Sequence, residues 1–171
     1  MSYVFSHAFI PLAILFIFSR QLIFNQKNIV ILSFFGILPD FDVIFLHRMT
    51  FHNIFILIIP LLFLIFTRKK EIAFIVSFYL FSHLILDLFN GGISVLYPFY
   101  NNIYFINAEI MSSYNVHSIM YALNYGIRGD FISNVAKVGN GYGIVSSENF
   151  GIAILLMIMI LISFIKRENI K

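Results

Sequence analysis

The segment from Leu38 to Asn53 carries the side chains of this sequence that are most suited to chemistry. It contains two carboxylates, Asp40 and Asp42, two imidazoles, His47 and His52, and the guanidinium of Arg48. Carboxylates and imidazoles are ligands that divalent metal ions take in proteins. Because apolar residues dominate nearly every other window of the chain, such a cluster predicts a metal-binding or catalytic site.

Two further pieces of the same kind lie outside that segment. His7 lies in the first apolar segment, and His83 and Asp87 lie four residues apart in the run His-Leu-Ile-Leu-Asp. This spacing places His83 and Asp87 on one face of a helix. The chain contains no cysteine, so any metal must be held by nitrogen and oxygen ligands.

Composition indicates the class of protein that positions these side chains. Of 171 residues, 60% are hydrophobic, 18% aromatic and 11% charged, and the mean hydropathy is +0.93. Soluble domains carry about a quarter of charged residues, so we predict an integral membrane protein. The length favours a single membrane domain over residues 1–171. The basic residues form short clusters between apolar segments, which is a topology signal and predicts no nucleic-acid partner.

The predicted fold is all-α, a polytopic membrane helical bundle of about five transmembrane segments with one long outer loop. The segments cover about residues 3–18, 28–46, 52–66, 71–89 and 150–165. Pro39 is expected to break the second helix. The outer loop covers residues 90–149, where we expect an interfacial helix within 107–125 and an ordered turn around Tyr97-Pro98-Phe99.

Basic residues predict how the bundle is oriented in the cell membrane. With the N-terminus outside and the C-terminus in the cytoplasm, eight of the eleven Lys and Arg residues face the cytoplasm. Only Arg48, Arg128 and Lys137 then lie outside. The positive-inside rule favours this orientation.

The same orientation gives the depth of each candidate ligand, counted from its cytoplasmic anchor at about 1.5 Å per helical residue. The residues counted are His7, Asp40, His52, His83 and Asp87. All of them fall in the outer half of a hydrocarbon core about 30 Å thick. Separate segments thus place their rare ionisable groups at one level, which predicts a single shared site.

The ordered set of motifs resembles the YdjM-type family of membrane-bound, predicted metal-dependent hydrolases. The matching features are an N-terminal His, a Leu-Pro-Asp-x-Asp turn, His-Arg with a second His five residues after the first, and His-x-x-Leu-Asp followed by Leu-Tyr-Pro-Phe, and they extend from His7 to Phe99. The family often has Thr directly before the second His, whereas this chain has Phe51 there, preceded by Thr50.

The resemblance implies a distant similarity to zinc-dependent phospholipase C and P1-type nuclease, helical enzymes that bind zinc through His and Asp. By that resemblance the metal ligands would be His7, Asp40, His52, His83 and Asp87, with Asp42 and His47 as further candidates. One or more Zn²⁺ ions, or another divalent metal, would then be the cofactor.

The chemistry that we expect is hydrolysis by a metal-bound water. The metal would acidify that water and polarise a phosphoryl or acyl oxygen. Arg48 is suited to a bidentate contact with a substrate phosphate or carboxylate, and Asp42 could act as general base. Because the site is predicted at the outer leaflet, the expected substrate is a membrane lipid or a lipid-linked phosphoester.

Two other functions are compatible with the same residues. A transporter of metal ions or protons also uses intramembrane Asp and His, but the inner halves of the segments lack ionisable groups apart from their basic ends, and no inverted repeat is visible. A structural membrane protein could use His83 and Asp87 as a polar clasp between helices. That clasp leaves the common depth of the polar groups unexplained.

Overall fold

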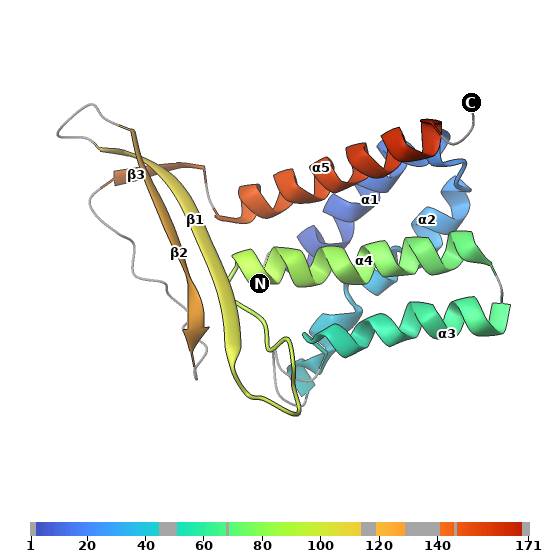
Figure 1. The fold of residues 1–171 in the computed structure, drawn as a ribbon, viewed down its shortest axis with the longest axis horizontal. Helices are drawn as coiled ribbons and strands as arrows, with labels where there is room; N and C mark the ends of the chain where they lie inside the picture. Colours follow the sequence, from blue (N-terminus) through green and yellow to red (C-terminus); the bar gives the residue numbers. More distant parts are fainter. Residues whose placement is uncertain are drawn as a thin grey trace.

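The computed structural model describes residues 3–44, 51–67, 69–113, 119–128, 141–145 and 147–168. The α-helices in these ranges are α1 (Tyr3–Leu22), α2 (Gln26–Leu32), α3 (Ile58–Thr67), α4 (Lys70–Phe89) and α5 (Ser147–Glu168). The short 3-10 helices are η1 (Ser33–Gly36), η2 (Leu38–Ile44) and η3 (Ile54–Leu57), and the strands are β1 (Ile103–Ser113), β2 (Ile119–Arg128) and β3 (Gly141–Val145). Figure 1 shows the long helices side by side and the sheet at the end of the bundle where α4 ends.

The helix α4 forms the centre of the bundle. It packs against α1, α3 and α5 (Figure 1). Ile75 and Leu86 of α4 are fully buried, and they share one core cluster with Leu15 of α1 and Leu155 of α5. Lipid tails are as apolar as leucine, so inside a membrane such a core is held by close packing rather than by removal from water.

The second apolar segment differs from the helix that we expected to reach Pro39. The helix α2 ends at Leu32, and the chain continues in 3-10 form through η1 and η2. Ser33 marks the change, because its hydroxyl donates to the carbonyl of Val30 at 2.7 Å and its backbone N–H bonds the same carbonyl. This i to i+3 bond tightens the turn before the proline is reached.

The phenol of Tyr79 joins α4 to α2. Its hydroxyl donates to the carbonyl oxygen of Ile29 at 2.9 Å, and both residues are fully buried. Ile29 lies in the last turn of α2, where carbonyl groups lack partners within the helix. The bond therefore satisfies a buried acceptor at the point where the helix changes form.

We expect Tyr79→Phe to lower the free energy of unfolding by about 1–2 kcal/mol, because it leaves that buried carbonyl without its donor. Thermal unfolding of the purified protein in detergent measures the loss. Tyr125→Phe removes the same hydroxyl from a side chain that is 76% exposed, so it should change little. Equal melting temperatures for the two variants would contradict the structural role of the Tyr79 hydroxyl.

The predicted loop over residues 90–149 contains a β-sheet, so the all-α prediction is wrong for this part of the chain. The strand β1 pairs antiparallel with both β2 and β3, in the order β2-β1-β3. The interfacial helix expected within 107–125 is also wrong, because the described part of this range is paired strand, with Ile106 opposite Tyr125 and Asn107 opposite Asn124. Isoleucine and tyrosine fit the pleated surface of a sheet well, and these residues lack the helical apolar period.

The predicted turn around Tyr97-Pro98-Phe99 is confirmed, with a cis peptide bond between Tyr97 and Pro98. Before this turn, Ile93 and Tyr104 exchange two backbone hydrogen bonds of 2.9 Å, which join the chain after α4 to β1. The backbone N–H of Ile54 donates to the carbonyl of Val95 at 3.1 Å. The end of α4 is thereby connected to the sheet and to the segment that carries His52.

Among the described residues, α4 is the one helix that is long and apolar enough to cross a bilayer. Shorter apolar helices cover Ser6–Leu22, Ile54–Phe66 and Asn149–Ile162, within or near three other predicted segments. Five spans, with the N-terminus outside and the C-terminus in the cytoplasm, stay a prediction.

Candidate metal centre

Five of the predicted ligands lie together near the end of α4. They are His7 of α1, Asp40 of η2, His52 just before η3, and His83 and Asp87 of α4. The three histidines and Asp87 are at most 3% exposed, and Asp40 is half-buried. The predicted convergence of these side chains is therefore confirmed, while their function as metal ligands stays a prediction.

The centre of the cluster consists of nitrogen and oxygen atoms at short range. Asp87 Oδ2 lies 2.8 Å from His52 Nε2 and 3.3 Å from His83 Nε2. The two imidazole nitrogens are 3.1 Å apart. Asp40 Oδ1 lies 3.7 Å from each of them. Four side chains thus direct one donor atom each toward a common point.

A backbone contact fixes the orientation of His83. Its Nδ1 lies 2.7 Å from the carbonyl oxygen of Gly36. A carbonyl can only accept, so Nδ1 carries the proton, and in the neutral ring the lone pair is left on Nε2. A backbone carbonyl that holds one ring nitrogen is the usual outer partner of a metal-bound histidine.

Gly36 also allows η1 to lie directly against α1. A Cβ atom at this position would lie 2.7 Å from the carbonyl oxygen of His7 and 2.9 Å from Cα of Ala8. Gly36 is not among the predicted site residues. Its role in placing both His7 and His83 was missed, because a backbone carbonyl leaves no mark in a sequence.

Some buried polar atoms of the cluster have no hydrogen-bond partner within the described part of the chain. These atoms are His7 Nδ1, Asp40 Oδ2 and Asp87 Oδ2. The contact of Asp87 Oδ2 with His52 is short, yet the two groups are not aligned as a hydrogen bond. Buried polar atoms normally have partners, so these atoms are available to bind a cation or side chains outside the described residues.

The distances fit a small cation. Ligands at about 2.0–2.2 Å from a tetrahedral zinc ion are separated from one another by roughly 3.3–3.6 Å. The ring nitrogens of His52 and His83 lie 2.8 to 3.7 Å from each other and from the oxygens of Asp40 and Asp87. The arrangement needs only small shifts to take up such an ion.

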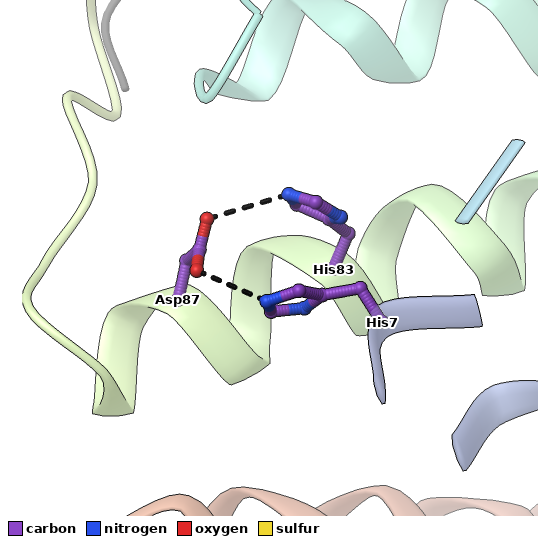
Figure 2. Close-up of side chains that lie close together, drawn as sticks. All are labelled: His7, His83 and Asp87. Carbon is purple, nitrogen blue, oxygen red and sulfur yellow. Dashed lines mark ion pairs between the residues drawn. The ribbon is translucent and has the colours of Figure 1, made fainter. Parts of the chain in front are cut away.

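His7 extends the cluster on the other side of Asp87. Its Nε2 lies 3.4 Å from Asp87 Oδ1. Figure 2 shows the Asp87 carboxylate with one oxygen directed at His7 and the other at His83. The rings of His7 and His83 have their centroids 4.3 Å apart. The carboxylate of Asp87 therefore contacts His7 through Oδ1, and His52 and His83 through Oδ2.

The side chains of the other predicted site residues lie outside the part of the chain that the structure describes. His47 and Arg48 lie outside the described residues. The backbone of Asp42 belongs to η2, but its side chain lies outside the described part. Their assigned roles as ligand, substrate contact and general base stay predictions.

The fold and the cluster together define a mainly helical chain with one described helix long and apolar enough to cross a membrane, and a buried group of His and Asp side chains. A family model, the YdjM inner membrane protein, matches residues 1–170, and the chain belongs to this family of membrane proteins. No curated protein and no solved structure matches the chain. Integration into a membrane, predicted from composition, is thus supported by the family.

Proposed function

We propose that this chain is a membrane-embedded, metal-dependent hydrolase that acts on a phosphoester or lipid-linked substrate. The observation that carries the proposal is the direction of the His83 lone pair. Gly36 holds the proton of His83 on Nδ1, so Nε2 directs its lone pair at Asp87 Oδ2 and Asp40 Oδ1. Electron-rich atoms that face one another in this way can hold a cation between them.

Charge supports the same interpretation. When ionised, Asp40 and Asp87 together carry two negative charges, and among the described residues the basic side chains that contact them are all histidines. Ionised carboxylates inside a membrane cost several kcal/mol unless they are paired, coordinated or hydrated. One divalent cation balances both carboxylates and leaves the histidines neutral, which is the form that binds metals.

The residues that would hold the ion are His52, His83, Asp40 and Asp87, with His7 supporting the second oxygen of Asp87. Imidazole and carboxylate ligands without thiolate favour Zn²⁺, although other divalent metals also accept them. When bound, such an ion polarises a phosphoryl or acyl oxygen and acidifies a coordinated water. The proposed distant likeness to zinc-dependent phospholipase C and P1-type nuclease favours a phosphoester as substrate.

The chain's own residues would supply the remaining functions. We assign to Asp42 the role of general base, because a carboxylate that is not a ligand can accept a proton. Arg48 would bind the substrate phosphate through two parallel N–H donors. The membrane location favours a lipid or a lipid-linked phosphoester, and the predicted orientation places the reaction at the outer leaflet.

The test combines metal analysis with an assay on the purified wild-type protein. We expect about one or more zinc ions per chain, and slow hydrolysis of bis(para-nitrophenyl) phosphate that a chelator abolishes and added Zn²⁺ restores. Bound zinc without hydrolysis of this probe or of a fluorescent phospholipid would reject the hydrolase and keep the metal centre. Absence of stoichiometric metal would support the polar clasp between helices.

A further inference from the structure

A second feature lies on the outer surface of the bundle, away from the metal-type cluster. A groove of about 490 Å³ runs between α3 and α4. One side includes Leu57 at the end of η3 and Leu61 and Leu64 of α3, and the α4 side includes Lys70, Ala73 and Ser77. The residues recur at spacings of three and four on each helix, so the groove follows the helix axes.

The walls of the groove are suited to a hydrocarbon chain. Leu61 and Leu64 are 53% and 38% exposed, so their side chains can contact lipid outside the bundle. Ala73 is small and buried, which leaves space between the two helices. In a membrane no water is available to fill such a space, and an acyl chain is the solvent that does so.

One end of the groove is positively charged. The turn from α3 to α4 lies there, because α3 ends at Thr67 and α4 begins with the exposed Lys70. The N-cap residue of α4, Lys69, makes no side-chain capping hydrogen bond. The positive end of the helix dipole therefore adds to the charge of the lysine.

The carboxylate of Glu71, next to Lys70 in sequence, makes its hydrogen bonds on another side of α4. Glu71 Oε1 accepts hydrogen bonds from the backbone N–H of Asn25 at 2.8 Å and from Asn28 Nδ2 at 3.1 Å. This carboxylate lines a separate pocket and is not part of the groove. Its bonds with Asn25 and Asn28 keep it from pairing with a ligand at Lys70.

We propose that this groove is a binding site for one anionic phospholipid. The acyl chain lies between α3 and α4, and the phosphate lies beside Lys70. Basic pockets between membrane helices bind anionic head groups in this way. Lys70 is separated from Asp87 by roughly 26 Å along α4, so this lipid is not the substrate of the metal centre, and the proposal does not depend on hydrolysis.

The experiment uses the full chain in nanodiscs that contain phosphatidylcholine and phosphatidylglycerol with identical acyl chains. Native mass spectrometry counts the lipids that stay bound after the disc is removed. Apolar burial does not distinguish the two lipids, so the preference comes from the head group. We expect roughly fivefold enrichment of phosphatidylglycerol, which corresponds to the roughly 1 kcal/mol that a lysine contributes at an anionic membrane surface.

Three variants separate this site from general attraction to a basic surface. Lys70→Gln should remove the preference, whereas Lys27→Gln, an equal change of charge at an exposed lysine outside the groove, should keep it. Leu61→Trp should reduce the number of bound lipids, because the larger side chain fills the groove from its exposed side. The proposal is overturned if Lys70→Gln keeps the preference for phosphatidylglycerol, or if Lys27→Gln loses as much of that preference as Lys70→Gln. It is also overturned if Leu61→Trp binds as many lipids as wild type, or if a second copy of the chain is retained in place of lipid.

Discussion

Replacement of Asp87 by asparagine is expected to lower the affinity for zinc by at least about 100-fold while the chain stays inserted and folded. Outer-shell partners of a metal site already contribute about 10–100-fold, and Asp87 would be a direct ligand. Its Oδ2 lies within 3.3 Å of both His52 and His83. Asparagine keeps the size and one acceptor oxygen but loses the negative charge that balances the cation.

The same substitution distinguishes a metal centre from a polar clasp. A clasp requires only hydrogen bonds, which asparagine can form. In a clasp, the loss of the Asp87 charge should therefore change stability little. Zinc content by mass spectrometry and the melting temperature in detergent should be measured together. Full zinc content in Asp87→Asn would remove Asp87 from the ligands and with it most of the argument for an enzyme.

Glu71→Gln is the matched control for that experiment. It makes the same change from carboxylate to amide in the same helix, roughly 24 Å away from Asp87. The glutamine oxygen can still accept from Asn25 and Asn28, which now bond the carboxylate. We expect unchanged zinc content, so a loss in both variants would indicate a general effect of charge in α4.

The clustering of the five candidate ligands could be predicted from the sequence because its signals are local and chemical. His83 and Asp87 have helical spacing, and α4 forms over Lys70–Phe89, where a helix was predicted over residues 71–89. His7, Asp40 and His52 are ionisable groups in apolar segments, where such groups are costly. Counting residues along the predicted segments was sufficient to expect one shared cluster, even though much of the second segment is 3-10 helix.

Other features of the fold depend on interactions that a sequence does not display. The strands β1 and β2 pair residues far apart in the chain, and the isolated segments carry no strict alternation of apolar and polar residues. The end of α2 is set by the side chain of Ser33, several residues before the expected break at Pro39. In both places local hydrogen bonds and cross-strand packing outweighed the signals of hydropathy and proline.

Gly36→Ala is expected to weaken zinc binding by about 10–100-fold, the range found for outer-shell partners of metal ligands. The added methyl group would lie 2.7 Å from the carbonyl oxygen of His7, a backbone atom that cannot rotate away. The segment η1 must then move from α1, and the Gly36 carbonyl moves with it from His83 Nδ1, which it now meets at 2.7 Å. We also expect a loss of about 1–3 kcal/mol in stability from the overpacking.

Metal geometry separates this positioning role from simple destabilisation. The visible spectrum of the Co²⁺-substituted protein reports the ligands directly, so a shifted spectrum in Gly36→Ala would show that the histidines have moved. Gly151→Ala is the matched control, because its added Cβ would meet Phe89 and Leu86 at the ordinary contact distances of 3.4 and 3.6 Å. That substitution in helix α5 should raise stability by about 0.5–1 kcal/mol and leave the spectrum unchanged. A wild-type spectrum in Gly36→Ala, together with lower stability, would mean that Gly36 serves packing alone and that His83 is oriented by other contacts.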